Sequence, residues 1–226
     1  MPVYNEKRTI IEILEKVRKE EIYLEKEIIV IDDKSTDGTK ELLLEHAHLY
    51  TTLCNHESNR GKGAAVRTGL EHATGDVIII QDADLEYSPS DYKKILEPII
   101  QGKTQAVYGS RFIKQPILSK QKWAIPTHFI GNKMLSMATS ILYMQKITDM
   151  ETCYKAIKKE ILRDIKLKSE RFDFEPEITA KLLKKKIKIQ EVPITYNSRK
   201  KNEGKKISWK DGIKAIWTLV YWRFKN

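Results

Sequence analysis

The amino-acid sequence predicts a single α/β domain with a mostly parallel central sheet and helices on both faces. Short apolar runs typical of buried strands alternate with longer amphipathic segments typical of helices, and this alternation favours parallel strands joined by right-handed crossovers. Polar or glycine-containing loops follow these runs. A chain of 226 residues, 41% of them hydrophobic, is long enough to bury one core without a second domain.

Local patterns place each element along the first half of the chain. Ile10, Leu14 and Val17 recur at helical spacing, whereas the unbroken apolar run 77–80 is typical of a strand buried on both faces. Ser88 is a good helix N-cap because a proline follows it at the first helical position. The predicted order is a helix at about 6–20, a strand at 27–31, a helix at 36–47, a strand at 50–54, a helix at 62–73, a strand at 76–80, a helix at 89–101 and a strand at 105–109.

Two carboxylates directly follow the predicted strand at 76–80. Asp82 and Asp84 lie on one side of an extended chain, where their mutual repulsion is unfavourable unless a cation lies between them. So few hard oxygen ligands suit Mg²⁺ or Mn²⁺, with water and phosphate oxygens completing the shell, which indicates a nucleotide diphosphate as partner. Asp-x-Asp pairs are also common as solvated carboxylates in turns, so the neighbouring loops are needed to distinguish a metal site from such a turn.

Two further loops at predicted strand ends favour a nucleotide. The loop 59–67 has glycines that permit close backbone approach, a following helix with free N–H groups, and the positive charge of Lys62; a turn that merely caps the helix is the alternative. Asp32 and Asp33 follow the strand at 27–31, where carboxylates can accept hydrogen bonds from a nucleobase or a ribose. The sequence therefore predicts a nucleotide site at one edge of the sheet.

Seven motifs occur in order along nearly the whole chain: P-V-Y-N-E at 2–6, I-D-D-K-S-T-D-G-T at 31–39, N-R-G-K-G-A-A at 59–65, Q-D-A-D-L-E at 81–86, Y-G-S-R-F at 108–112, T-D-M-E-T-C-Y-K at 148–155 and R-F-D-F-E-P-E at 171–177. With them the chain resembles family 2 glycosyltransferases, most of all the dolichol-phosphate or polyprenol-phosphate mannosyl and glucosyl transferases. The resemblance implies a Rossmann-like fold of the glycosyltransferase A type with a small antiparallel acceptor region. It also implies an inverting enzyme that uses Mg²⁺ or Mn²⁺ to move a hexose from a UDP- or GDP-sugar to a lipid phosphate.

The resemblance also assigns site residues. At the nucleotide base and ribose it places Pro2, Tyr4, Glu6 and Asp33, with Asp32 beside them. Around the metal and the diphosphate it places Asp82, Asp84 and Glu86. The candidate catalytic residues are Asp84, Arg111 and Asp149.

Arg111 and Asp149 bear on the acceptor. By resemblance Arg111 lies near a phosphate, where a guanidinium can hold two oxygens, although an arginine at a strand end can also be simply solvated. Asp149 lies where relatives with hydroxyl acceptors keep a catalytic base. A lipid phosphate is already an anionic nucleophile, so Asp149 would then orient the acceptor or the sugar hydroxyls, or hold a loop. The alternatives are a transferase that glycosylates a saccharide or protein hydroxyl with Asp149 as base, and a catalytically silent membrane-binding relative.

The chain departs from the family pattern at its start. Relatives usually have a strand of about five residues before P-V-Y-N-E, whereas Met1 precedes that motif directly, so we expect the first strand to be missing. Either the start codon is misassigned, or the sheet lacks a strand beside the nucleotide site and is weakened there. We expect residues 1–115 to form a nucleotide-sugar-binding half, 116–200 an acceptor-side half and 201–226 a basic amphipathic segment. Neither the two cysteines nor the five histidines show the spacing of a metal or redox site.

Positive charge is concentrated at the carboxyl end. Residues 181–226 carry fourteen Lys and Arg against three acidic residues, a net charge of +11 in a chain of +10. The last segment also has an apolar stripe at helical spacing, made of Trp209, Ile213, Trp217, Val220 and Phe224. Such a stripe beside Lys210, Lys214 and Arg223 is typical either of a helix at a membrane interface or of a helix that packs on its own domain.

This pattern predicts a cytoplasmic enzyme bound peripherally to the cytoplasmic face of a membrane. No apolar run approaches the roughly 18 residues of a spanning helix, so the basic segment or a membrane-anchoring partner subunit would hold the chain there. Nucleic acid is a disfavoured partner because no nucleic-acid-binding motif accompanies the basic residues. A nucleotidyltransferase is disfavoured because the basic glycine-containing loop is the third loop along the chain rather than the first.

Overall fold

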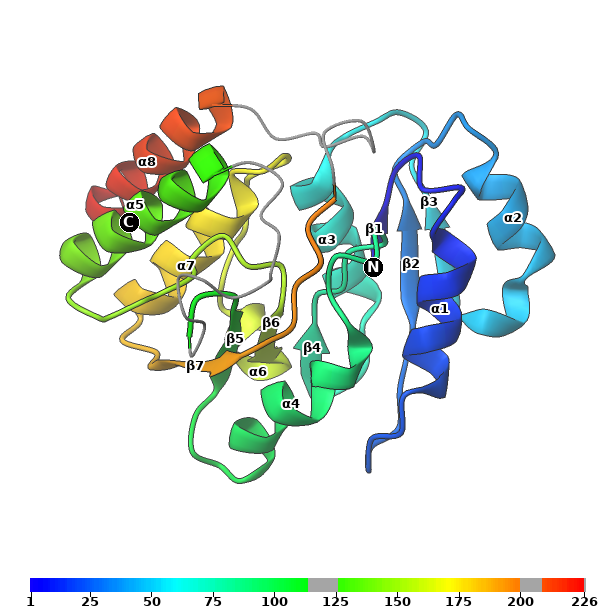
Figure 1. The fold of residues 1–226 in the computed structure, drawn as a ribbon, viewed down its shortest axis with the longest axis horizontal. Helices are drawn as coiled ribbons and strands as arrows, with labels where there is room; N and C mark the ends of the chain where they lie inside the picture. The colour runs from blue at the N-terminus through cyan, green and yellow to red at the C-terminus, as the bar shows by residue number, and fades with distance from the viewer. Residues whose placement is uncertain (114–125, 200–208, 226) are drawn as a thin grey trace.

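The computed structural model describes residues 1–113, 126–199 and 209–225, in which strands and helices alternate as the sequence predicts (Figure 1). The strands are β1 (Pro2–Val3), β2 (Ile29–Asp32), β3 (Thr52–Asn55), β4 (Val77–Ile79), β5 (Ala106–Ser110), β6 (Lys155–Lys158) and β7 (Ile189–Pro193). The helices are α1 (Ile10–Lys19), α2 (Thr39–Glu45), α3 (Lys62–His72), α4 (Tyr92–Ile100), α5 (Pro126–Tyr143), α6 (Lys159–Arg163), α7 (Phe174–Lys184) and α8 (Trp209–Phe224), with short 3₁₀ helices η1 (Ala47–Leu49) and η2 (Pro89–Asp91).

The strands form two hydrogen-bonded sheets. The first has the order β1, β2, β3, and its strands are all parallel. The second has the order β4, β6, β5, β7, in which β5 is parallel to β7 and β6 is antiparallel to both β4 and β5. In this second sheet β4, β5 and β7 therefore point the same way and β6 alone reverses. The predicted α/β class with mostly parallel strands is confirmed, and β6 is the antiparallel strand of the second sheet.

The expectation of a missing first strand is wrong. β1 pairs with the last two residues of β2. The Met1 amino group also donates to the Ile29 carbonyl (2.7 Å), and the Ile31 N–H donates to the Met1 carbonyl (2.9 Å). Met1 and the two residues of β1 are enough to pair with β2, because backbone groups alone form the hydrogen bonds of a parallel ladder. β1 is short, but it brings the following loop to the end of β2.

Two helices begin later than the sequence suggests because residues before them adopt positive φ. Asn5 has a φ of 55°, and its side chain accepts a hydrogen bond from the Thr36 N–H (2.7 Å), so residues 4–9 form a loop before α1. Gly38 has a φ of 93° and directly precedes α2. Lys34, with a φ of 64°, adopts the left-handed conformation that glycine would adopt more easily.

Helices α5, α7 and α8 gather on one side of the molecule, opposite α1 and α2 (Figure 1). α8 packs through a buried face made of Ala215, Thr218, Leu219 and Trp222. The predicted apolar stripe lies on another face, where Ile213, Trp217 and Phe224 are 60%, 67% and 80% exposed. Packing on the domain is therefore the wrong interpretation for these three side chains, and a membrane role stays a prediction.

Parts of the predicted acceptor half and basic segment lie outside the described residues, as do the side chains of Trp209 and Lys210. Within the described residues, no helix combines the length and the apolar character needed to span a bilayer.

Candidate active site

Loops that follow β1, β2, β3, β4, β5 and β7 supply the candidate site, and direct contacts join them. The Ser35 side chain accepts a hydrogen bond from the Asn5 N–H (2.9 Å), which links the loops after β1 and β2. Tyr87 and Tyr196 form an isolated antiparallel bridge, which links the loop after β4 to the segment after β7. The predicted strand-end loops therefore meet in one region.

Asp33 organises the glycine-containing loop. Its buried carboxylate accepts hydrogen bonds from the N–H groups of Arg60 (2.9 Å) and Gly61 (2.7 Å), and His56 Nδ1 lies 2.6 Å from its Oδ1 atom. Asp32, also buried, accepts from the Ser35 N–H. No histidine was predicted in the site from the sequence, because the partner of His56 lies 23 residues away.

The glycines of the loop make room for another part of the chain. Gly61 has a φ of 95°, and a Cβ atom built there would lie 2.5 Å from the Glu170 carbonyl oxygen. A Cβ atom at Gly63 would lie 2.5 Å from the Ser169 carbonyl oxygen, and the Ala64 N–H donates to Glu170 (3.0 Å). Close backbone approach was expected of these glycines, and the approaching segment is 169–171.

Lys62 joins two carboxylates from different elements. Its Nζ atom lies 2.9 Å from Asp82 Oδ1 and 2.8 Å from Glu175 Oε1, at the start of α7. Burial alone would lower the pKa of Lys62, but Asp82 and then Glu175 hold it well above its ordinary value. Lys62 is therefore a charged anchor between α3, the loop after β4 and α7, and its pairing with Glu175 is not visible in any local pattern.

Asp84 carries the least compensated charge of the three predicted metal ligands. Burial, followed by the nearby charges of Asp82 and Glu86, raises its pKa to about 7. Asp82 is held by Lys62, and Glu86 accepts hydrogen bonds from the Tyr196 hydroxyl (2.8 Å) and the Arg199 N–H (2.7 Å).

This arrangement bears on the predicted metal site. In the part of the chain that the structure describes, no three His, Cys, Asp or Glu side chains gather into a group able to hold a metal ion. The predicted trio of Asp82, Asp84 and Glu86 does not form such a group, and two of its members already have cationic or N–H partners, Asp82 in Lys62 and Glu86 in Arg199. Asp84 still fits a hard cation, since a positive charge there would relieve the repulsion that raises its pKa.

Arg199 connects three of the site's loops and was not singled out from the sequence. Its guanidinium pairs with Glu6, with NH2 2.6 Å from Oε2 and NH1 3.2 Å from Oε1. Its Nε atom donates to the Asp84 carbonyl (3.0 Å), and its backbone N–H donates to Glu86. Glu6 thus lies in the site, held by an arginine 193 residues away. Pro2 lies in β1, and Tyr4 lies in the loop between β1 and α1.

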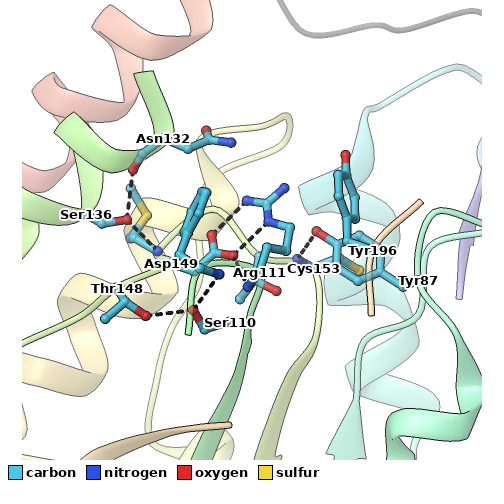
Figure 2. Close-up of polar contacts among 12 residues, drawn as sticks. Tyr87, Ser110, Arg111, Asn132, Ser136, Thr148, Asp149, Cys153 and Tyr196 are labelled. Atoms are coloured by element: carbon cyan, nitrogen blue, oxygen red, sulfur yellow. Dashed lines mark hydrogen bonds and ion pairs between the residues drawn. The ribbon is translucent and has the colours of Figure 1, made fainter. Parts of the chain in front are cut away.

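Arg111 and Asp149 form a buried pair at the end of β5, and Figure 2 shows their two side chains facing each other. The Nε and NH2 atoms of Arg111 each lie 2.7 Å from an oxygen of Asp149, and the Arg111 N–H donates to the same carboxylate (2.9 Å). Burial alone would lower the pKa of Arg111, but the Asp149 carboxylate holds it well above its ordinary value. Both oxygens of the predicted base therefore already accept hydrogen bonds.

Aromatic side chains surround this pair. The Arg111 guanidinium lies 5.0 Å from the ring centre of Tyr196 and 5.7 Å from that of Phe112. Phe112 meets Phe129 of α5 edge to face, with ring centres 5.3 Å apart, and Lys133 Nζ lies 4.9 Å from the Phe129 ring centre. The region beside Arg111 thus combines cationic and aromatic groups.

A second buried cluster lies behind Lys62. Burial, then the charge of Glu175, raises the pKa of Glu151 to about 8. The Lys155 ammonium donates to the carbonyls of Met150 (3.0 Å) and Thr152. Among the described residues, Glu151 Oε1 and Glu175 Oε2 are buried without a hydrogen-bond partner. A protonated Glu151 at neutral pH fits this environment, because a buried carboxyl without a partner is more stable uncharged.

Comparisons of this chain with known proteins agree on one family. The family model for glycosyl transferase family 2 matches residues 1–166. The chain is 31% identical to the glycosyltransferase AglJ of Haloferax volcanii over 88% of its own length and 62% of that protein. It is 30% identical to a dolichol-phosphate mannosyltransferase of Pyrococcus furiosus over 91% of its own length and 57% of that protein. The chain thus spans less than two thirds of these two relatives.

A shorter relative and a solved structure agree. A UDP-N-acetylglucosamine–dolichyl-phosphate N-acetylglucosaminyltransferase of Methanococcus voltae is 30% identical over 86% of this chain and 82% of that protein. Glucosyl-3-phosphoglycerate synthase from Mycobacterium tuberculosis superposes with a TM-score of 0.74 at 18% identity, covering 99% of this chain and 79% of that one. Another structure of that synthase contains Mn²⁺, UDP and glucosyl-3-phosphoglycerate (TM-score 0.72, 16% identity, 98% and 76% covered).

The likeness to the solved structures concerns the fold, and it confirms the glycosyltransferase A-type fold predicted from the sequence. The family model covers well over half of the chain, and the relatives span most of it. The chain therefore belongs to glycosyl transferase family 2.

Proposed function

We propose that this chain is an inverting, metal-dependent glycosyltransferase that moves a hexose from a nucleotide diphosphate sugar to a polyprenyl or dolichyl phosphate. Family membership supports glycosyl transfer. Relatives named for dolichol or dolichyl phosphate support a lipid phosphate acceptor. The fold neighbour with Mn²⁺ and UDP supports a nucleotide donor and a divalent ion, either Mg²⁺ or Mn²⁺.

The buried pair of Arg111 and Asp149 is the observation that carries the acceptor class. A hydroxyl acceptor must lose its proton to a base as it attacks, and Asp149 is the residue predicted for that role. Both oxygens of Asp149 accept hydrogen bonds from Arg111, so the carboxylate is committed to holding a cation. A phosphate monoester is already ionised at neutral pH and needs no base. The geometry thus favours the phosphate acceptor over the hydroxyl alternative.

In the proposed reaction a phosphate oxygen of the lipid attacks the anomeric carbon of the donor sugar. A new carbon–oxygen bond forms on one face while the bond to the nucleoside diphosphate breaks on the other, so the anomeric configuration inverts. Arg111 supplies positive charge for the incoming phosphate, and Asp149 fixes the position of that guanidinium. A divalent ion held by Asp84, with Asp82 beside it, would offset the charge that develops on the diphosphate leaving group.

Other residues of the chain shape the donor side in this proposal. Asp33 fixes the glycine-containing loop through the N–H groups of residues 60 and 61. Lys62 keeps Asp82 in place, and Arg199 keeps Glu6 and Glu86 in place. Asp32, Pro2 and Tyr4 remain proposed contacts for the base and the ribose. These residues position the donor rather than take part in bond making.

We also propose that the enzyme works at the cytoplasmic surface of a membrane, through its basic C-terminal segment or a membrane-anchoring subunit. A lipid phosphate acceptor supports this location because its isoprenoid chain stays in the bilayer. Lys214 and Arg223 of α8 and Lys225 directly after it are exposed, and their charges suit an anionic surface.

A screen of UDP- and GDP-sugars tests the function. The chain is incubated with a short polyprenyl phosphate and Mg²⁺ or Mn²⁺, and released nucleoside diphosphate is measured together with the lipid product. We expect release only when the lipid phosphate is present and loss of release in EDTA. Release of pyrophosphate, or transfer to a saccharide or peptide hydroxyl in place of the lipid phosphate, would refute the proposal.

A further inference from the structure

Helices α5 and α8 lie side by side (Figure 1), and each exposes large apolar side chains. On and directly after α5 these side chains recur every three or four residues, with exposed fractions from 57% to 88%: Ile130, Met134, Met137, Ile141 and Met144. On α8 they have exposed fractions from 36% to 80%: Ile213, Ile216, Trp217, Tyr221 and Phe224. We call these ten residues the α5–α8 face. An exposed apolar surface of this extent is typical of a binding surface rather than of ordinary solvent exposure.

The packing shows that this face is not an unfilled core. α5 uses Leu135, Ser136 and Thr139 as its buried side, and the Tyr143 hydroxyl donates to the Leu219 carbonyl of α8 (2.7 Å). Lys181 of α7 covers the Trp222 ring, with Nζ 3.5 Å from the ring centre. Each helix is thus docked through one side while its apolar opposite side faces outward.

The charges beside the face are positive. Lys133 of α5, Lys214 and Arg223 of α8, and Lys225 directly after α8 are all exposed. The sequence of α5 contains no acidic residue, and that of α8 contains only Asp211 in its first turn. This charge complements an anionic surface. It disfavours pairing of two copies, because a two-fold contact would bring the same cations together.

The amino-terminal end of the face adjoins the candidate site. Phe129 lies one residue before Ile130 and contacts Phe112, which directly follows Arg111. Lys133 Nζ lies 5.8 Å from the ring centre of Phe112. An apolar chain lying along α5 would therefore have its polar end close to Lys133 and Arg111.

We propose that the α5–α8 face is a docking surface for an anionic lipid monolayer, with α5 as well as α8 lying in the interface, and that this contact presents the Arg111 side of the site to the lipid headgroups. The contact goes beyond the basic C-terminal segment, because half of the apolar side chains come from α5 and the residue directly after it. Aromatic, methionine and isoleucine side chains bordered by lysine and arginine match the composition of helices that lie in the plane of a membrane. Only the identity of the acceptor rests on the proposed function, and membrane binding itself does not.

The test is sedimentation of the purified full chain with vesicles of phosphatidylcholine and phosphatidylglycerol. The double variant Met137→Glu, Ile141→Glu places charge on α5 alone. We expect it to weaken partitioning by at least roughly tenfold, because two apolar side chains can no longer enter the interface. Leu44→Glu is the matched control, since Leu44 is 58% exposed on α2, on the opposite side of the molecule. We expect this variant to partition like the wild type, and both should melt cooperatively like the wild type.

Quenching of tryptophan fluorescence by brominated lipids gives an independent measurement. We expect wild-type fluorescence to be quenched on binding and Trp217→Phe to lose much of that quenching, because Trp217 is 67% exposed on the face. Equal partitioning of wild type and the α5 double variant would overturn the proposal. A dimer in analytical ultracentrifugation that the α5 variant dissociates, without any effect on vesicle binding, would also overturn it and assign the face to a second copy.

The readouts separate this inference from the proposed function. Vesicle binding without transfer to polyprenyl phosphate would contradict the proposed function and leave the docking surface supported. Transfer to a short-chain polyprenyl phosphate in detergent, with vesicle binding unchanged by the α5 variant, would contradict the docking surface and leave the proposed function supported.

Discussion

Among the single residues of the donor side, Asp84 has the environment that most favours a bound cation. It is partly buried beside two other carboxylates, and its pKa of about 7 lies well above its ordinary 3.8. Asp82 differs because Lys62 compensates it, with Nζ 2.9 Å from Oδ1. A carboxyl whose pKa is raised in this way destabilises the fold once it is ionised, and a bound cation would reverse that effect.

The first prediction concerns the pH dependence of stability without metal. The Asp84 carboxyl ionises more easily in the unfolded chain than in the folded one, so the free energy of unfolding should fall as pH rises from about 4 to about 7. Asp84→Asn removes this loss, and we expect it to stabilise the metal-free protein at pH 8 by about 1–3 kcal/mol. Chemical denaturation at several pH values in EDTA measures this.

The same variant also tests the metal assignment without an activity assay. Mn²⁺ should raise the melting temperature of the wild type at pH 8 and have little effect on Asp84→Asn, because binding to the folded state stabilises it by mass action. An equal rise for both proteins would remove Asp84 from the metal site.

At the scale of elements, α3 is fitted closely against the segment 169–171. The second prediction is that Gly63→Ala costs about 1–3 kcal/mol of stability, because its Cβ would lie 2.5 Å from the Ser169 carbonyl oxygen and the backbone must shift. Gly131→Ala in α5 is the control, since a Cβ there meets no described atom within 4 Å. We expect it to be neutral or stabilising by up to about 1 kcal/mol, as alanine favours a helix. Equal unfolding free energies for both variants would contradict the packing.

The two faces of α8 give a third prediction. Trp222 is 7% exposed against α7, whereas Trp217 is 67% exposed. Trp222→Ala should lower the free energy of unfolding by about 3 kcal/mol or more, because it leaves a cavity, and Trp217→Ala should change it by less than about 0.5 kcal/mol. Urea denaturation of the two variants measures this, and the opposite ranking would invert the orientation of α8. Deleting α8 would expose this core, so substitutions are the sharper test of its outer face.

Across the whole molecule, the sequence predicted the strands and the loops at their ends, because local residue patterns encode them. Apolar runs located strands β2 to β5, and the loops after them meet where the sequence predicted a site. Contacts between distant residues were not predictable, because no local period records them. Lys62 meets Glu175, and Arg199 meets Glu6 across 193 residues. The sequence also showed no sign that Lys62 and Arg199 hold Asp82 and Glu86, two of the three proposed metal ligands.

In the proposed reaction, glycosyl transfer needs no general base because the acceptor is a phosphate. The fourth prediction therefore concerns Asp149→Asn, which keeps one acceptor oxygen for Arg111 but cannot take a proton. The measurement is kcat as a function of pH with polyprenyl phosphate as acceptor, below the melting temperature of the variant. Breaking a buried ion pair lowers that temperature, so thermal melting is measured first. We expect kcat of Asp149→Asn to fall by less than about tenfold and its pH profile to be unchanged. A fall in kcat of about 10² to 10⁴, with loss of an ionisation from the pH profile, would identify Asp149 as a general base and contradict transfer to a phosphate without a base.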